Sequence, residues 1–169
     1  MATSTQFTPP ERHLDIDHVF DARLVLLDLE AQNAEAAIRE LAGLLLKAGY
    51  VRETFADAVV AREKDFSTGL QLKLLGAAIP HTYPTYVLKT GVAAGRLAHP
   101  VTFGAMGFPG QTVSATLVLL LAVKDADSQV EMLQHIAELL RSEDAQGKLI
   151  SARTAEDVVA VLESREVHA

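Results

Sequence analysis

The stretch ATLVLLLAV, at residues 115–123, carries the strongest secondary-structure signal in the 169-residue chain. Thr116 is its only polar residue, so a strand built from it would be apolar on both faces. Such strands are typical of the centre of a sheet that helices cover on both sides. The run is also only about half as long as the ~20 residues that a membrane-spanning helix needs. The stretch therefore predicts a central, covered strand.

Helix and strand signals continue from this strand toward the N-terminus. The segment LVLLDL at residues 24–29 predicts a short buried strand. Asn33 is a suitable N-cap for the helix that follows, and Gly49 suits its C′ position. A second helix is expected over residues 52–64. Further short strands are expected where Gly and Pro divide the apolar sequence into pieces, at residues 76–79, 91–97 and 101–103.

Toward the C-terminus the pattern becomes helical. Asp127 or Ser128 can cap a helix, and a short second helix is expected over residues 144–151. Thr154 can cap a final helix. The apolar stripe of the first of these helices is expected to consist of Val130, Leu133, Ile136, Ala137 and Leu140.

The order of these elements predicts an α/β fold. A single domain is expected, with three αβα layers and a mostly mixed central sheet. The domain should span residues 19–165. A flexible N-terminal tail is expected at residues 1–18 and a short C-terminal tail at residues 166–169.

Composition and charge narrow the class of protein. Cysteine is absent, which excludes disulfides, thiolate nucleophiles and cysteine-based metal sites. The net charge is −7 at pH 7 and no run of Lys or Arg occurs, so nucleic-acid binding is not expected. An acidic protein of this kind favours partners with a basic face. The N-terminus lacks the basic start and the apolar stretch of a signal peptide, so a cytoplasmic location is expected.

Six histidines are the main candidates for chemistry. His13 and His168 lie in the expected tails, His99 lies in a loop, and His135 is expected on the polar side of a helix. No two histidines have the i, i+4 spacing that is typical of zinc sites, so no metal is expected. No phosphate loop, nucleophile elbow or dinucleotide fingerprint occurs, so no cofactor is expected either.

His81 differs from the other histidines in its position. It follows Pro80, directly after the strand expected at residues 76–79. A side chain just past a strand end lies at the sheet edge, where α/β folds bind ligands. On spacing alone, a surface histidine without a role remains the alternative.

Arg62 also has two interpretations. At a helix end, an Arg–Glu pair is usually part of a solvated surface. If the turn at residues 66–70 folds toward His81, however, Arg62 could hold a phosphate by a bidentate contact.

Three segments carry a resemblance to a known family. They are GYVRETFADAVVAREKDFSTGL (49–70), GAAIPHTYPTYVLKTGVAAGRLAHPVTFGAMG (76–107) and TLVLLLAVKDADSQVEMLQHIAELL (116–140). In this order they resemble the type-2 IIA components of the bacterial phosphoenolpyruvate-dependent sugar phosphotransferase system, the mannitol/fructose/galactitol-like family. IPHT followed by VLKTGVA is the most specific part, and PVTFGAMG looks most like the galactitol-type branch.

The resemblance implies a phosphoryl carrier. His81 matches the histidine that accepts a phosphoryl group from the phosphocarrier protein HPr and passes it to the IIB component, while the membrane IIC component carries the sugar. Arg62 matches the arginine that supports this site. Glu63 and Thr68 fall on the family pattern as scaffold, and Thr82 is a candidate for stabilising the phosphoryl oxygens. No cofactor or metal is implied.

One departure from the family keeps other functions open. Many members carry a second histidine at the start of the helix after the last long strand, and Asp127 is expected at that position. Since an ionised carboxylate would repel a phosphate, a non-catalytic interaction domain stays open as an alternative. A regulatory phosphoprotein of the nitrogen-related IIA type, which would accept phosphate but signal through binding, is a further alternative. Four large apolar side chains are expected around the site and would suit docking, with ordinary packing as the alternative: Phe66, Tyr83, Met106 and Phe108.

Overall fold

The computed structural model describes residue 14 and residues 16–164. Within this part of the chain, five strands form one sheet: β1 (Phe20–Leu29), β2 (Gly69–Gln71), β3 (Gly76–Ala78), β4 (Gly91–Gly104) and β5 (Thr112–Ala122). The same residues contain five α-helices: α1 (Ala34–Lys47), α2 (Phe55–Asp65), α3 (Ala126–Arg141), α4 (Glu143–Ser151) and α5 (Ala155–Glu163). Short 3-10 turns lie at Ile16–His18 and Pro84–Tyr86.

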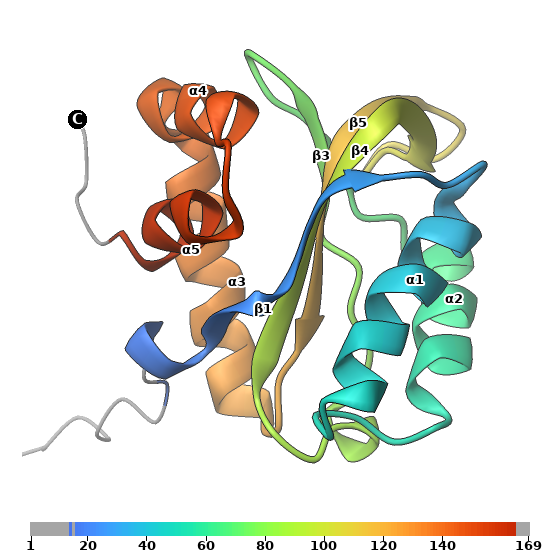
Figure 1. Ribbon diagram of the computed structural model, residues 1–169. Coiled ribbons are helices and arrows are strands. Elements are labelled where there is room, and N and C mark those ends of the chain that lie inside the picture. The colour runs from blue at the N-terminus through green and yellow to red at the C-terminus, as the bar shows by residue number, and fades with distance from the viewer. Residues whose placement is uncertain (1–13, 15, 165–169) are drawn as a thin grey trace, which may run out of the picture.

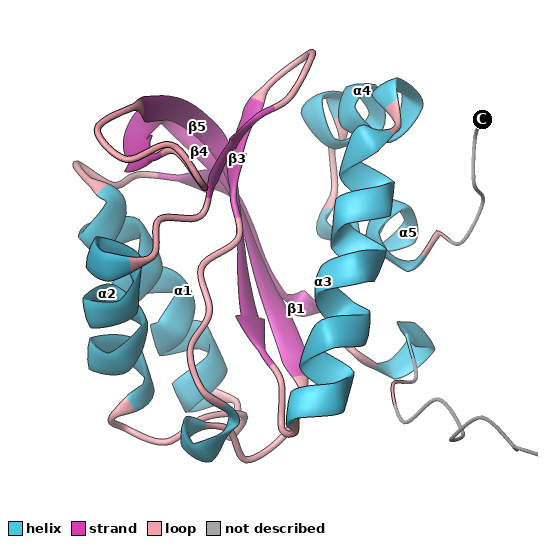
Figure 2. Ribbon diagram, turned by 180° about the vertical axis from the view of Figure 1, so that it is seen from behind, coloured by secondary structure: helices cyan, strands magenta, loops and turns pink. Residues whose placement is uncertain are grey.

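The sheet is mixed, with the strand order β1-β4-β5-β3-β2. The pairs β1–β4 and β3–β5 are parallel, whereas β4–β5 and β2–β3 are antiparallel. Helices α1 and α2 cover one face of the sheet, and α3, α4 and α5 cover the other (Figure 1, Figure 2). The three-layer α/β domain expected from the sequence is therefore confirmed.

The central strand β5 divides the core into two halves. Its side chains alternate in direction, as in any strand. Leu119 and Leu121 belong to the apolar cluster that includes Met132 of α3, whereas Val118 and Leu120 belong to the cluster that includes residues of α1. All five of these side chains are buried. The apolar run at residues 115–123 is thus the covered central strand that its composition predicts.

The other strands differ from the expected ones in three respects. β1 is an edge strand and is only partly buried, whereas a buried strand was expected at residues 24–29. The pieces at residues 91–97 and 101–103 form one strand, β4, because its pairing with β5 continues across a register shift between Arg96 and Val101. β2 has no counterpart among the expected elements, and at three residues it is too short to show a pattern.

Most of the expected helix ends are confirmed. Asn33 caps α1 by accepting a hydrogen bond of 2.8 Å from the N–H of Ala36. Gly49 follows this helix with a φ of 84°, a left-handed conformation that glycine adopts without strain. Thr154 caps α5 in a reciprocal capping box with Asp157. α2 begins at Phe55, later than expected.

The cap and the buried face of α3 differ from the expectation. Asp125 is the N-cap, and neither Asp127 nor Ser128 has this role, because the Asp125 carboxylate accepts from the Ser128 N–H at 2.8 Å. Val130 is 55% exposed, although the expected apolar stripe includes it. The buried positions of α3 are Ser128, Met132, Ile136, Leu139 and Leu140.

The N-terminal boundary of the domain also lies earlier than expected. Leu14 and Ile16 are buried in the core cluster that contains Val19, so the expected tail at residues 1–18 ends too late. Residues 1–13, 15 and 165–169, with the expected C-terminal tail and with His13 and His168, lie outside the described residues. Among the described residues, no helix is long and apolar enough to span a membrane.

Candidate functional site

His81 lies in the loop that follows β3. The N–H of Leu121 in β5 donates to the Pro80 carbonyl at 3.0 Å, which extends the pairing between these two strands as far as His81. The Nδ1 atom of His81 lies 2.9 Å from the carbonyl oxygen of Ile79. Because a carbonyl oxygen can only accept, Nδ1 carries the proton and donates it. In the neutral ring, Nε2 therefore keeps its lone pair.

The surroundings of His81 favour this neutral ring. Burial is the main reason why the pKa of His81 lies below its ordinary value of 6.5. The hydrogen bond to Ile79 raises the pKa, whereas the positive charge of Arg62 lowers it. A neutral imidazole at pH 7 is the form that can act as a nucleophile.

Arg62 lies in the last turn of α2, close enough to lower the pKa of His81 by its charge. Its guanidinium carbon lies 4.8 Å from the ring centroid of Phe66 and 5.0 Å from that of Tyr83. Two cation–π contacts hold the group between these rings without using its hydrogen-bond donors. Among the described residues, no acceptor is bonded to the Arg62 guanidinium. The expected proximity of Arg62 to His81 is therefore present.

Glu63 and Thr68 form a pair behind the turn that ends α2. The Glu63 carboxylate accepts from the Thr68 N–H at 2.9 Å and from the Thr68 hydroxyl at 2.8 Å. Both side chains are buried. Burial raises the pKa of Glu63 to about 7, against the opposing effect of the two Thr68 hydrogen bonds. Their role as scaffold stays a prediction from the family resemblance.

The start of α3 contacts the His81 loop through a residue that the sequence analysis missed. Gln129 Nε2 donates to the Thr82 carbonyl at 2.9 Å. Thr82 itself is buried. Asp127 is exposed in the first turn of α3, and no hydrogen bond or ion pair joins it to His81 among the described residues. The side chain that α3 directs at this loop is therefore Gln129, and not Asp127.

Four apolar side chains that were expected around this site, Phe66, Tyr83, Met106 and Phe108, are exposed and are called the apolar rim here. Two of them stack on Arg62, as described above. The other two lie at the tip of the β4–β5 hairpin, which contacts the start of β2. There the N–H of Met106 donates to the Gly69 carbonyl at 2.8 Å. A Cβ atom at Gly69 would lie 2.5 Å from the Gly104 carbonyl oxygen, so this close approach needs glycine.

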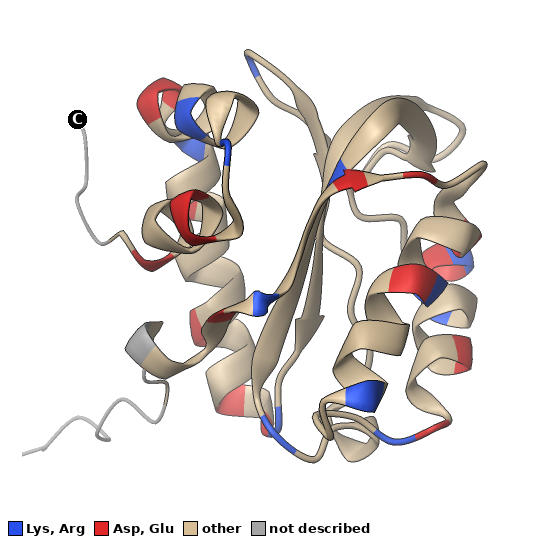
Figure 3. Cartoon of the chain, in the orientation of Figure 1, with Lys and Arg blue, Asp and Glu red and all other residues tan. Residues whose placement is uncertain are grey.

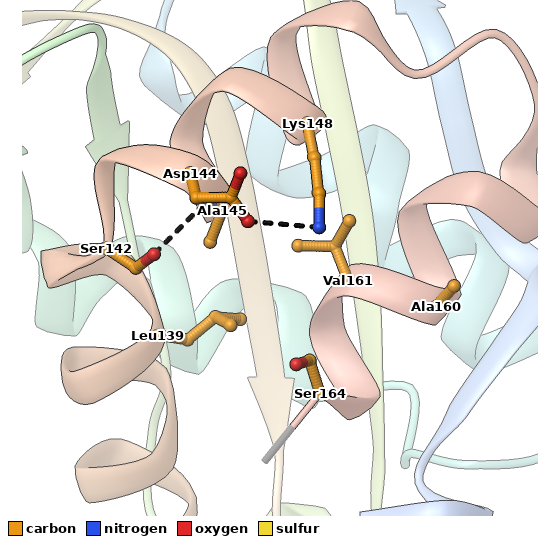
Figure 4. A pocket seen from close by; sticks show the side chains of 8 residues that line it. All are labelled: Leu139, Ser142, Asp144, Ala145, Lys148, Ala160, Val161 and Ser164. Atoms are coloured by element: carbon orange, nitrogen blue, oxygen red, sulfur yellow. Dashed lines mark hydrogen bonds and ion pairs between the residues drawn. The ribbon is translucent and has the colours of Figure 1, made fainter. Parts of the chain in front are cut away.

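Two hollows lie away from His81. The first, of about 150 Å³, lies between α3, α4 and α5, where Asp144 and Lys148 form an ion pair of 3.0 Å across its edge (Figure 4). The second, of about 320 Å³, is lined mainly by leucines together with Arg96 and Ile150. Arg96 is occupied there by backbone carbonyls, including that of Ala152 at 2.6 Å. Neither hollow contains a residue of the expected site.

Charged groups elsewhere form no second centre. Basic and acidic residues are interspersed over the helices and connecting segments (Figure 3). Within the described ranges, no group of three His, Asp or Glu side chains could hold a metal ion. His135 was expected on the polar side of its helix, but it is partly buried and its Nε2 lies 2.7 Å from the Leu162 carbonyl of α5. Its role is therefore to join α3 to α5.

The fold is that of a small three-layer α/β domain, with His81 in the loop after β3 and Arg62 in the last turn of α2. A family model described as "Phosphoenolpyruvate-dependent sugar phosphotransferase system, EIIA 2" matches residues 18–165. The chain belongs to this family, as its three segments indicate.

Known proteins of this class are similar over most of the chain. The multiphosphoryl transfer protein of Salmonella typhimurium is 35% identical over 136 residues, which cover 79% of this chain and 34% of that protein. The chain thus spans about a third of that relative's length. The enzyme IIA of the Escherichia coli mannitol system, solved in complex with phosphorylated enzyme IIB, is 26% identical, with a TM-score of 0.72 over 87% of this chain and 100% of that one. The nitrogen regulatory protein IIA-Ntr of Neisseria meningitidis is 25% identical, with a TM-score of 0.70 over 87% and 98% of the two chains.

Proposed function

We propose that the protein is a phosphoryl carrier that accepts a phosphoryl group on Nε2 of His81. The observation that carries this proposal is the hydrogen bond of 2.9 Å between His81 Nδ1 and the Ile79 carbonyl. It selects the tautomer in which Nε2 is the nucleophile. Burial also lowers the pKa of His81, so that the ring is neutral when a donor arrives.

The transfer itself is a displacement at phosphorus. The Nε2 lone pair forms a bond to phosphorus while the bond between phosphorus and the donor's nitrogen breaks, and the donor keeps that electron pair. The phosphorylated ring retains the Nδ1 proton, and the Ile79 carbonyl stabilises the positive charge that the ring acquires. The Arg62 guanidinium is positioned to stabilise charge on the phosphoryl oxygens.

Backbone groups supply further candidates for binding these oxygens. Neither the N–H of His81 nor that of Thr82 donates to an acceptor among the described residues. The hydroxyl of Thr82 is a weaker candidate, because the residue is buried and its carbonyl is bonded to Gln129. No metal or organic cofactor takes part in this mechanism.

The proposed partners follow from the family. We expect HPr as the donor, a IIB component as the acceptor, and the membrane IIC component as the protein that carries the sugar, with the relay in the cytoplasm. An enzyme IIB is the partner in the similar mannitol complex, which supports the second of these assignments. The apolar rim offers a docking surface around His81. The galactitol-type branch stays a prediction.

A regulatory phosphoprotein is the second candidate. The similarity to a nitrogen regulatory IIA protein favours it, because that chain is matched almost completely. A regulatory protein would use the same His81 chemistry and would differ in the protein that reads the phosphorylated state. The third alternative, a non-catalytic domain, rested on Asp127, and no hydrogen bond or ion pair joins this residue to His81 among the described residues.

The central test is phosphorylation by a reconstituted donor chain. The protein is incubated with labelled phosphoenolpyruvate, enzyme I and HPr, and we expect an acid-labile, base-stable phosphate. His81→Ala should abolish the label, whereas His99→Ala, at an exposed histidine in β4, should retain it. An unlabelled parent protein, or full labelling of His81→Ala, contradicts the proposal. Adding purified IIB and following loss of the label then separates a relay from a protein that only stores the signal.

A further inference from the structure

We propose that Glu63 is a positioning residue for phosphoryl transfer, acting on His81 through Thr68 and Ile79. This inference rests on the proposed function, and it assigns a task to a pair that family likeness marks only as scaffold. Glu63 does not reach the phosphoryl group, so its effect must pass through the backbone that holds the imidazole.

The connection consists of consecutive hydrogen bonds. Glu63 accepts from the N–H and the hydroxyl of Thr68 at 2.9 and 2.8 Å. The Thr68 carbonyl accepts from the N–H of Ile79 at 3.3 Å. The Ile79 carbonyl in turn accepts from His81 Nδ1 at 2.9 Å. Ile79 selects the tautomer of His81 through its carbonyl, and its N–H is bonded to Thr68. Thr68 is in turn held by Glu63.

A carboxylate suits this position better than a neutral side chain. Its two oxygens accept both donors of Thr68, whereas the amide of a glutamine has a single oxygen, and its NH₂ group could bond the Thr68 hydroxyl only if that hydroxyl turned from donor to acceptor. A carboxylate with only 9% of its surface exposed and no cationic partner among the described residues is costly to keep. For a fold-stabilising contact alone, an uncharged pair would avoid this cost.

The protonation of Glu63 gives the arrangement a measurable signature. Burial raises the pKa of Glu63 to about 7, and the two Thr68 hydrogen bonds oppose this shift. Arg62 precedes Glu63 on α2, but the Arg62 guanidinium lies over the rings of Phe66 and Tyr83 and forms no ion pair with Glu63 among the described residues. When pH falls through about 7, one carboxyl oxygen gains a proton and becomes a donor, so the Thr68 hydroxyl must turn from donor to acceptor to keep its bond. The hold on Ile79 should weaken in the same range.

Matched variants separate positioning from stability. Thr68→Val removes the hydroxyl donor and keeps the N–H, whereas Thr68→Ser keeps both donors. Glu63→Gln removes the charge, and Glu138→Gln on the exposed face of α3 is its control. Two quantities are measured on the whole protein: the ring ¹⁵N shifts of His81 by NMR, which report the tautomer without any phosphate, and the rate of phosphorylation by phosphorylated HPr from pH 6 to 8.

We expect Glu63→Gln and Thr68→Val to reduce the Nδ1-protonated tautomer of His81 and to slow phosphorylation by roughly tenfold or more, because small misplacements of a nucleophile have large kinetic effects. In the parent protein, the rate of phosphorylation should fall as pH drops through about 7, where Glu63 gains a proton. Glu63→Gln should lack this change. Thr68→Ser and Glu138→Gln should behave as the parent. If Glu63→Gln fails to fold, the comparison of Thr68→Val with Thr68→Ser still tests whether the contact between Glu63 and Thr68 positions His81.

Two results would overturn the inference. One is a parent-like His81 tautomer in both Glu63→Gln and Thr68→Val. The other is an unchanged rate profile in folded variants. Failure of the proposed function looks different, because the parent itself would take no phosphate, while the tautomer measurement on unphosphorylated protein would still test the role of Glu63.

Discussion

The hydrogen bond between His81 and Ile79 has a consequence for how the ring titrates. Burial lowers the pKa of His81 below 6.5, and the charge of Arg62 acts in the same direction. We therefore expect the ring to be neutral throughout pH 7 to 8 and to protonate only below 6.5, with the Nδ1 proton retained. NMR titration of the His81 ring carbons measures this. In Arg62→Gln, loss of the nearby cation should move the midpoint upward, and a downward shift would contradict the proposed proximity.

Arg62 is held by aromatic rings and keeps its donors available, which predicts a separation between rate and stability. We expect Arg62→Gln to slow phosphorylation by roughly 100-fold, as for the loss of one charge-stabilising donor. The free energy of unfolding should change by only about 1 kcal/mol, since exposed cation–π contacts are weak. Stopped-flow transfer and chemical denaturation measure the two quantities.

Arg141→Gln is the matched control for this substitution. Arg141 is exposed in the last turn of α3, so its loss changes the net charge equally without touching the site. Equal slowing of transfer in both variants would mean that overall charge, and not the position of Arg62, sets the rate.

The candidate site could be predicted from the sequence only in part. His81 stands out because it follows a short apolar strand, and Arg62 because the family likeness pairs the two. Gln129 could not be found in this way. Its contact with the Thr82 carbonyl joins residues 47 positions apart, and it depends on how α3 is rotated about its own axis. Asp127 and Gln129 both lie in the first turn of α3 and, two residues apart, point in different directions, so sequence alone does not say which one faces the loop.

The rotation of α3 follows from its cap. Apolar residues occupy so many positions between Val130 and Leu140 that two stripes are possible. Because Asp125 caps the helix by bonding Ser128, the buried stripe runs through Met132 and Ile136, and Val130 faces solvent. Strands show the same limit, since the bulge in β4 can be recognised only from its pairing with β5.

Docking of α3 on the His81 loop predicts an effect of Gln129 on both elements. We expect Gln129→Ala to lower the free energy of unfolding by about 1 kcal/mol, through loss of one hydrogen bond to the Thr82 carbonyl. It should also broaden the His81 and Thr82 amide resonances in NMR spectra, because the loop loses its tether to the helix.

Gln134→Ala provides the comparison for this prediction. Gln134 is exposed in the middle of α3 and makes no hydrogen bond through its side chain among the described residues. Its replacement should leave the loop resonances sharp. Unchanged loop resonances in Gln129→Ala would instead show that the loop is held by the pairing of Pro80 with β5 alone.

In the complete domain, the site is built where three separate segments meet on one side of the sheet. The end of α2 supplies Arg62 and Phe66, the loop after β3 supplies His81 and Tyr83, and the β4–β5 hairpin contributes its tip. The helical layer of α3, α4 and α5 covers the opposite face of the sheet (Figure 2), and Gln129 at the start of α3 bonds the loop after β3. The exposed apolar rim therefore offers a protein that approaches this side of the sheet an apolar surface to contact.

This arrangement predicts a binding effect at the hairpin tip. Phe108 is 61% exposed, and the tip is held against the start of β2 by the bond between Met106 and Gly69. We expect Phe108→Ser to raise the KM for phosphorylated HPr by roughly tenfold, the effect of ~1.4 kcal/mol of lost contact. The limiting rate of transfer should change little, because Phe108 does not touch the reacting atoms. Steady-state phosphorylation at varied HPr concentration separates the two constants.

Ile150→Ser is the control for this prediction. Ile150 is 47% exposed on α4, in the opposite helical layer. The Ile150→Ser substitution therefore removes a comparable apolar surface at a place where no partner is expected to bind. If both variants raise KM equally, general surface hydrophobicity would explain the effect. If Phe108→Ser alone lowers the limiting rate, the hairpin tip would act in the chemical step and not in docking. A rise in KM confined to Phe108→Ser assigns the tip to the surface that captures the donor, since only a group that contacts the donor before the transfer changes binding without changing the rate of the bound complex.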